Sequence, residues 1–168
     1  DYGWWGKFGA CTEDANGNKI ADETTRAEAL KRYERYWEQI SERFKGYSDH
    51  LIFESANEEF GNHINDYNLG FNTAVNGVTG NLTVAECYTL TNKLNQDFVD
   101  IVRKSGGNNE NRHLLLAGYN TDIKNTLDDS YKMPKDNDAN GTSKLSVSVH
   151  YYDPWGFCGD DAHGTYTP

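Results

Sequence analysis

The chain has 168 residues, and its 26 acidic and 16 basic side chains give it a formal net charge of −10. This balance argues against a nucleic-acid or anionic-membrane partner, because both require a basic patch. In addition, no apolar run approaches the roughly 20 residues of a membrane helix. Aromatic residues make up 13% of the chain, which is unlike a disordered segment. The length therefore fits one folded domain of ordinary size.

Residues 1–23 are rich in Gly, Asn and Asp, and we expect them to form a loop that carries two tryptophans. A helix is predicted to follow, because Thr25 and Glu28 have the spacing of a capping box. Apolar residues then recur every three or four positions, which gives the helix one buried stripe. This stripe consists of Leu30, Tyr33, Trp37, Ile40 and Phe44. Gly46 is predicted to end the helix.

The short apolar run at 51–53 predicts a strand that is buried on both faces. Residues 59–81 are rich in Asn, Gly and aromatics, and a loop of this length is usually functional. Thr83 and Glu86 then have the spacing of a second capping box. The helix that they begin is predicted to end at Gly106.

Two further strands are predicted at 114–117 and 145–149, with one short helix near 126–131 between them. Strands that alternate with long helices are typical of βα units. The sequence therefore predicts an α/β fold with a parallel sheet in a single domain.

Polar side chains follow the first and last of these strands. The first strand runs into Glu-Ser-Ala-Asn-Glu-Glu at 54–59, and the last runs into His-Tyr-Tyr-Asp-Pro-Trp at 150–155. In parallel α/β folds, ligands bind at the carboxyl ends of the strands. Any one of these residues alone could be a helix cap or a solvated loop residue, but their joint position indicates a site.

A metal site is not indicated. No two of the five histidines have the i, i+4 spacing of a helical zinc site. The three cysteines are widely spaced and form no C-x-x-C pair, so at most one disulfide can form. We therefore expect neither a metal nor another cofactor.

Three segments resemble glycoside hydrolase family 5, the endoglucanase (cellulase) family. The run HLIFESANE at 50–58 is similar to the family's strand-four signature, and VSVHYYDPW at 147–155 is similar to its strand-six segment. The opening DYGWW at 1–5 resembles the loop after strand three. The three occur in the family's order, so the resemblance covers essentially the whole chain. One departure is Glu59, which stands where the family often has proline.

The resemblance implies a partial TIM (β/α)8 barrel that contains about strands four to six and the intervening helices. Residues 1–168 would then be an internal fragment of one catalytic domain. The family's nucleophilic Glu follows strand seven, which lies beyond the segments that match. Glu54, Glu86 and Glu110 do not have the strand-end context of such a nucleophile. We therefore expect the 168-residue chain to have no activity by itself.

By the resemblance, Glu58 is the acid/base carboxyl of a retaining glycosidase, and burial together with the nucleophile's charge would raise its pKa. Asn57 would bind the sugar 2-hydroxyl. His150 and Tyr152 would line the central subsite, with Tyr152 also orienting the nucleophile. The flat indole faces suit pyranose rings. We expect this substrate-binding role for Trp4, Trp5 and Trp155, although ordinary packing in the barrel is the alternative for each.

The implied activity is hydrolysis of internal β-1,4-glucosidic bonds in cellulose or a related β-glucan. A related barrel hydrolase that acts on xyloglucan, mannan or mixed-linkage glucan is an alternative. Another is a non-catalytic carbohydrate-binding protein, although such modules are usually all-β. The resemblance also implies a secreted protein that is monomeric when intact and needs no cofactor.

Overall fold

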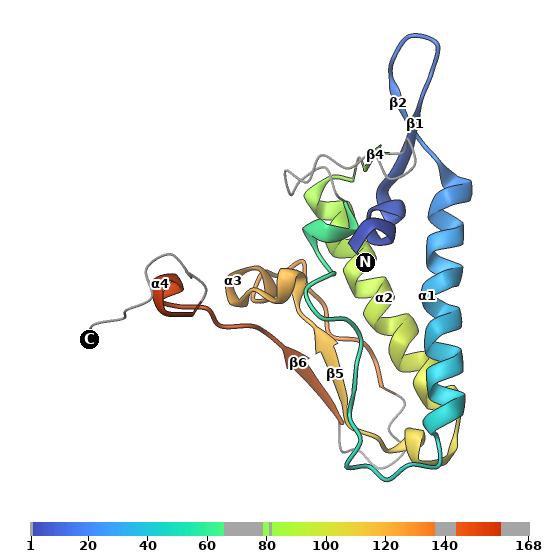
Figure 1. The fold of residues 1–168 in the computed structure, drawn as a ribbon, viewed down its shortest axis with the longest axis vertical. Helices are drawn as coiled ribbons and strands as arrows, with labels where there is room; N and C mark the ends of the chain where they lie inside the picture. Colours follow the sequence, from blue (N-terminus) through green and yellow to red (C-terminus); the bar gives the residue numbers. More distant parts are fainter. Residues whose placement is uncertain (1, 66–78, 81, 137–143, 159–168) are drawn as a thin grey trace.

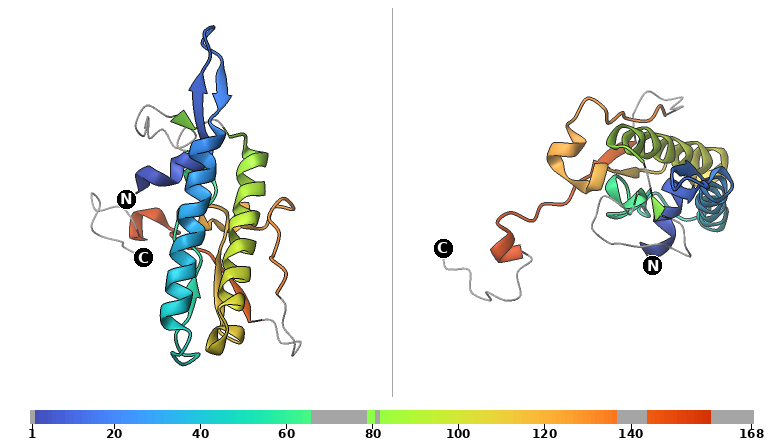
Figure 2. Two further views of the ribbon diagram at one scale, coloured as in Figure 1. Left: turned by 90° about the vertical axis from the view of Figure 1, so that its right-hand side faces the viewer. Right: turned by 90° about the horizontal axis from the view of Figure 1, so that it is seen from above.

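The computed structural model describes residues 2–65, 79–80, 82–136 and 144–158 (Figure 1). Two long helices, α1 (Glu23–Phe44) and α2 (Val84–Lys104), lie side by side and pack against a three-stranded sheet (Figure 2). The α/β class predicted from the alternation of strands and helices is confirmed.

The main sheet consists of β3 (Phe53–Glu54), β5 (Leu114–Ala117) and β6 (Leu145–Ser148) in the order β3-β5-β6. Both neighbouring pairs are parallel, and Leu114 is the register partner of Phe53 on one side and of Leu145 on the other. Helix α2 connects β3 to β5, as expected for a βα unit. The prediction that residues 51–53 form a strand buried on both faces is only partly correct, because Ile52 is 49% exposed.

Aromatic rings join the two helices to the sheet. The Trp37 ring on α1 lies 5.8 Å from the Phe53 ring on β3 and 4.4 Å from the Phe98 ring on α2. Each buried aromatic ring removes a large apolar area from water. The apolar stripe predicted for the first helix therefore faces the core, and its member Tyr33 is buried there.

The two long helices begin with different caps. Thr83 and Glu86 form a capping box at the start of α2, as the sequence predicts. Helix α1 instead begins earlier than expected, at Glu23, with Asp22 as its N-cap. The Asp22 carboxylate accepts from both the backbone amide and the hydroxyl of Thr25. The prediction of a capping box that begins at Thr25 is therefore wrong, because the Asp22 carboxylate, three residues earlier, is the cap and binds the Thr25 amide.

The prediction that residues 1–23 form a loop is wrong. Tyr2–Gly9 forms a 3₁₀ helix, and β1 (Ala10–Glu13) and β2 (Lys19–Ala21) form an antiparallel hairpin. The Asp14 carboxylate closes the turn by accepting from two backbone amides, and Gly17 supplies a positive φ of 78°. Strand β4 (Thr79–Gly80) pairs with the other edge of β1.

The remaining elements are short. Helix α3 (Ile123–Thr126) begins three residues before the range 126–131 where a short helix was expected and ends at its first residue, because the Asp122 side chain caps it by accepting from the Asn125 amide. Helix α4 (Trp155–Cys158) follows β6. Three 3₁₀ turns, at Asn62–Ile64, Gly107–Glu110 and Tyr119–Thr121, complete the described segments.

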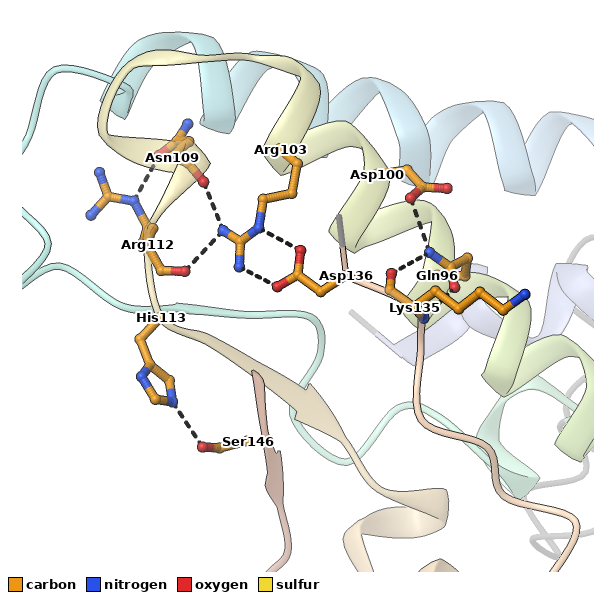
Figure 3. A network of polar contacts seen from close by, with 9 residues as sticks. All are labelled: Gln96, Asp100, Arg103, Asn109, Arg112, His113, Lys135, Asp136 and Ser146. Carbon is orange, nitrogen blue, oxygen red and sulfur yellow. Dashed lines mark hydrogen bonds and ion pairs between the residues drawn. The ribbon is translucent and has the colours of Figure 1, made fainter. Parts of the chain in front are cut away.

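Buried arginines organise the amino-terminal end of the sheet (Figure 3). Arg103 makes a two-pronged ion pair with Asp136, with N–O distances of 2.9 and 2.8 Å. Its remaining terminal nitrogen donates to the backbone carbonyls of Asn109 and Arg112. The Arg103 and Asp136 side chains are only 12% and 6% exposed.

Arg112 is fully buried just before β5. Its guanidinium lies 4.7 Å from the Phe53 ring and donates to the side-chain oxygen of Asn109. It also donates to four backbone carbonyls, those of Phe44, Tyr47, Ser48 and Leu51. One side chain thus satisfies the carboxyl end of α1 and the connection that leads to β3.

All three cysteines are free: Cys11 and Cys87 are buried, and Cys158 is exposed. Burial raises the pKa of the Cys87 thiol to about 11. Among the described residues, no helix combines the length and hydropathy needed to cross a bilayer.

Candidate functional site

The carboxyl ends of β3 and β6 bring the predicted site segments together. Both strands pair in parallel with β5, so both point to the same end of the sheet (Figure 1). The chain leaves β3 through Ser55 and reaches Glu58 three residues later, while β6 leads directly into Val149 and His150. The two segments expected to share a site therefore do so.

A buried hydrogen-bond network holds the end of β3 in place. The Ser55 hydroxyl donates to the side-chain oxygen of Asn95 on α2 at 2.7 Å and accepts from the amide of Ala117 at 2.9 Å. The Asn95 amide group donates to the Ala117 carbonyl at 2.9 Å. Because Ser55 and Asn95 are both buried, these bonds fix the backbone from which the Glu58 segment departs.

Glu58 lies in direct contact with two of the predicted site residues. His150 Nδ1 lies 2.7 Å from Glu58 Oε1, and the Tyr152 hydroxyl donates to the same oxygen at 2.5 Å. The Tyr152 oxygen also lies 3.2 Å from His150 Nδ1. The side chains of Glu58 and His150 are 31% and 25% exposed. These three groups form a partly solvated cluster of acid, imidazole and phenol that we call the Glu58 cluster.

The pKa of Glu58 lies below its ordinary value of 4.5, chiefly because of the hydrogen bond from Tyr152 and then that from His150. Burial acts against this lowering but is outweighed by the two hydrogen bonds, and electrostatic attraction to His150 and His63 adds smaller contributions that lower the pKa. The pKa of Glu58 is thus lowered among the described residues, whereas the raised pKa expected from the resemblance depends also on the charge of the nucleophile and stays a prediction. Two donors stabilise the ionised carboxylate, and its exposure keeps the desolvation cost small.

Tyr152 has a different immediate partner from the one expected. Its hydroxyl donates to Glu58 itself, so in this structure it orients the carboxyl predicted to be the acid/base. Asn57, which was expected to bind a sugar hydroxyl, has an exposed side chain beside the cluster. The Asn57 backbone amide donates to the Glu59 carboxylate at 2.7 Å. Glu59 therefore stiffens the turn through a hydrogen bond where a proline would stiffen it covalently.

The three candidate tryptophans occupy two kinds of environment. Trp155 is 61% exposed and meets the Tyr152 ring edge-on at 6.0 Å, so it extends the Glu58 cluster. Trp4 and Trp5 stack on each other at 4.3 Å and pack against the core. Trp5 also contacts the Phe60 ring at 5.9 Å. Both rings therefore have packing partners, whereas Trp155 presents most of its surface to solvent.

Two further expectations concern a metal site, which was not expected, and a long loop. Within the described residues, no group of three or more His, Cys, Asp or Glu side chains is arranged to hold a metal ion. The long functional loop expected at 59–81 lies mostly outside the described residues.

Sequence reasoning missed residues that support the site from behind. Asn95 lies in the buried stripe of α2, where its polarity among apolar neighbours was an available signal. The turn after β5 also went unnoticed, although Asn120 and Thr121 there have positive φ values of 53° and 49°. Asn120 is a weak signal for that conformation, because asparagine tolerates it, whereas a β-branched threonine gives none.

Comparison with known proteins places these segments in context. The family model described as cellulase (glycosyl hydrolase family 5) matches residues 5–167. Endoglucanase A of Paenibacillus barcinonensis is 38% identical, over 77% of this chain and 30% of its own length. The xyloglucan-specific endo-beta-1,4-glucanase of Bacteroides ovatus is 37% identical, over 77% of this chain and 22% of its own length.

A solved structure gives the same result. A family 5 lichenase from a Caldicellulosiruptor species, in complex with cellotetraose, superposes with a TM-score of 0.66 at 34% identity. The match covers 80% of this chain and 34% of the lichenase. The chain thus spans about a third or less of the length of each of these three proteins.

Proposed function

Because the chain belongs to glycosyl hydrolase family 5, we propose that residues 1–168 form an internal fragment of the catalytic (β/α)8 barrel of a β-glucan hydrolase. Strands β3, β5 and β6 correspond to barrel strands four to six, and α2 is the helix between the first two. Their parallel order supports this placement. A complete barrel has eight such strands in about 250 residues, and the relatives are three or more times longer than the matched part.

The proposed reaction is retaining hydrolysis of internal β-1,4-glucosidic bonds, with Glu58 as the acid/base. In the first step, Glu58 gives its proton to the glycosidic oxygen as that bond breaks and a carboxylate nucleophile attacks the anomeric carbon. In the second step, Glu58 takes a proton from the water that displaces this nucleophile. The nucleophile belongs to barrel strand seven, outside the matched segments. The observation that carries this proposal is the contact of Glu58 with His150 and Tyr152.

The lowered pKa of Glu58 suits its role as a base in the second step. Its role as an acid in the first step requires a neighbouring charge that raises the pKa. A general base that removes a proton from water must be ionised, and the two donors favour that form. For the first step the pKa must rise. A nucleophilic carboxylate about 5–5.5 Å away would raise it by charge repulsion. Formation of the covalent intermediate neutralises that charge, which returns the pKa to the lower value seen here.

Sugar binding is proposed for the exposed groups around the Glu58 cluster. Asn57 would donate to the 2-hydroxyl of the sugar, and Trp155 would stack on a pyranose ring. Packing makes Trp4 and Trp5 weaker candidates, because each ring already contacts the other and the core.

The substrate class follows from the relatives. Cellulose or a related β-glucan is proposed because the P. barcinonensis relative is an endoglucanase. Xyloglucan and mixed-linkage glucan are the specific alternatives, favoured by the names of the B. ovatus relative and of the lichenase. Such polymers lie outside cells, so the protein is proposed to be secreted.

The test is Glu58→Gln in the full-length hydrolase. Turnover of cello-oligosaccharides should fall by about 10²–10⁴-fold, whereas an aryl glycoside with a good leaving group should lose less in its first step. Added azide should then restore the second step and give a glycosyl azide of retained configuration. Glu54→Gln is the matched control, because Glu54 is an exposed carboxylate on the same segment. Normal turnover by Glu58→Gln would exclude the acid/base role.

The 168-residue chain alone should not hydrolyse carboxymethylcellulose, because it contains only one of the two required carboxyl groups. The purified chain is assayed for released reducing ends beside the full-length hydrolase. Hydrolysis at a rate comparable to that of the full-length protein would show that the nucleophile lies within these residues.

A further inference from the structure

The turn after β5 has a backbone conformation that its residues rarely adopt. Asn120 and Thr121 have φ values of 53° and 49°, in the left-handed region. Asparagine tolerates this region, but a β-branched threonine there is a genuine outlier. Thr121 is also buried, at 1% exposed. Such conformations persist only where surrounding contacts hold them, and they cluster at functional sites.

One side of this turn binds the segment that carries Glu58. The backbone amide of Asn120 donates to the Phe60 carbonyl at 3.0 Å. In return, the Asn62 amide donates to the side-chain oxygen of Asn120 at 2.7 Å. The Tyr119 hydroxyl adds a third bond, to the side-chain oxygen of Asn62 at 2.7 Å. These bonds begin only two residues after Glu58, so they fix where its segment runs.

The same turn binds the residue that contacts Glu58 from the other strand. The Thr121 carbonyl accepts from the His150 backbone amide at 2.7 Å. Because the positive φ of Thr121 sets the direction of its carbonyl, an ordinary backbone conformation would point that acceptor elsewhere. The turn therefore sits between the two chain segments whose side chains meet at Glu58 Oε1.

Gly61 makes the close approach possible. Its φ is 91°, and a Cβ at this position would lie 2.2 Å from the side-chain oxygen and 2.7 Å from the backbone nitrogen of Asn120. No other residue type fits both the conformation and the space. The Glu58 segment and the turn are thus matched to each other across this contact.

We propose that Gly61, Asn120 and Thr121 are positioning residues that set the distance between the Glu58 carboxyl and the His150 imidazole. This inference rests on the proposed acid/base role of Glu58. The three residues act through backbone hydrogen bonds at the rear of the site and are not expected to touch substrate.

The test uses two variants of the full-length hydrolase. Asn120→Gly keeps the backbone conformation but removes the acceptor for Asn62, and Gly61→Ala forces the two segments apart. Each should lower kcat by about tenfold or more, because small displacements of a catalytic group are costly. KM should change less than about threefold, since binding contacts remain. Asn120→Gly adds no atoms, so it carries the test if Gly61→Ala fails to fold.

A pH profile separates positioning from simple destabilisation. The groups that act on the Glu58 carboxyl are Tyr152, His150 and His63. Loosening the first two from Glu58 raises its pKa, so the limb of the kcat/KM profile that reports Glu58 should move to higher pH. Val102→Ala, in the buried core of α2, is the matched control. It should lower Tm without changing kcat or the profile.

A conservative variant of Thr121 and a stability-only outcome give the results that would support or overturn this inference. Thr121→Asn should keep kcat within about threefold, because asparagine adopts the left-handed region and keeps the backbone carbonyl that accepts from the His150 amide. If Asn120→Gly and Gly61→Ala lower only Tm, with kcat and the pH profile unchanged, the turn stabilises the fold without positioning Glu58, and the inference is wrong. That outcome leaves the proposed function intact when Glu58→Gln has lost turnover. Normal turnover by Glu58→Gln would instead remove the function on which the inference rests.

Discussion

The ionisable groups at the two ends of the parallel sheet differ in their exposure to solvent and in their partners. At the amino-terminal end, Arg112 is buried and the side chains of Arg103 and Asp136 are only 12% and 6% exposed. Their charges are matched by an ion pair and by backbone carbonyls (Figure 3). At the carboxyl-terminal end, Glu58 and His150 remain partly exposed and bind each other.

This difference separates the groups that stabilise the fold from the groups that can take part in proton transfer. A buried charge whose hydrogen bonds are all made cannot change its protonation state without breaking the structure. A partly exposed carboxyl with two side-chain donors can exchange protons with solvent or substrate, and its pKa responds to each partner. Substitutions at the two ends should therefore affect different measurements.

The largest effect on stability is expected from Arg112→Ala. The substitution leaves a cavity and removes the donor for four backbone carbonyls, those of Phe44, Tyr47, Ser48 and Leu51. The free energy of unfolding should fall by about 4 kcal/mol or more, measured by urea denaturation of the full-length protein. The kcat of the protein that remains folded should not change. A loss below about 1 kcal/mol would mean that water replaces the guanidinium without cost.

Arg103→Met should cost about 3 kcal/mol, because it leaves the Asp136 carboxylate buried without its partner. The double variant with Asp136→Leu should recover part of this loss, since no charge is then buried. Recovery is incomplete because Arg103 also binds the carbonyls of Asn109 and Arg112. Equal stability of the single and double variants would contradict the picture of a mutually dependent pair.

Thr83→Ala, at the start of α2, should cost about 1 kcal/mol. It removes one half of the capping box, including the oxygen that accepts from the Glu86 amide. Thr25→Ala is the comparison, because Thr25 lies inside α1 and only its hydroxyl, which donates to the Asp22 cap, is lost. Its cost in thermal or urea unfolding should be smaller. A larger cost for Thr25→Ala would contradict Asp22 as the main cap of α1.

The smallest effect on stability is expected from Tyr152→Phe, and it depends on pH. Loss of this donor raises the pKa of Glu58 toward 4.5. A lowered native pKa adds stability above pH 4.5 and loses it as the pH falls through the native value. The variant should therefore be less stable than wild type by about a few tenths of a kcal/mol near pH 6. This difference should disappear as the pH falls below the lowered native pKa, where the Glu58 carboxyl is protonated in wild type and variant alike. An NMR titration of Glu58 gives the direction directly, and an unchanged pKa would remove Tyr152 as its main donor.

The features that could be predicted from the sequence are local or repetitive. Strand β5 matches its predicted bounds, and the α2 capping box is correct because both partners lie within one turn. The meeting of the Glu58 and His150 segments followed from a general rule about strand ends. Their resemblance to family 5 added the roles proposed for them.

The features that could not be predicted are choices between local alternatives or depend on contacts distant in the sequence. Helix α1 begins at Glu23 because Asp22, and not Thr25, is its N-cap and accepts from the Thr25 amide. The pKa of Glu58 follows from Tyr152, which lies 94 residues away. The left-handed Thr121 has no sequence signal, since the bonds that hold it come from segments on either side of β5.

The placement of the three thiols offers a practical consequence. Cys11 and Cys87 are buried, and the high pKa of Cys87 keeps it protonated at neutral pH, whereas Cys158 is exposed. A maleimide dye should therefore couple selectively to Cys158, at the end of the short helix α4 that begins with Trp155. The emission of a dye at that position, three residues after Trp155, should respond to oligosaccharide binding beside Tyr152.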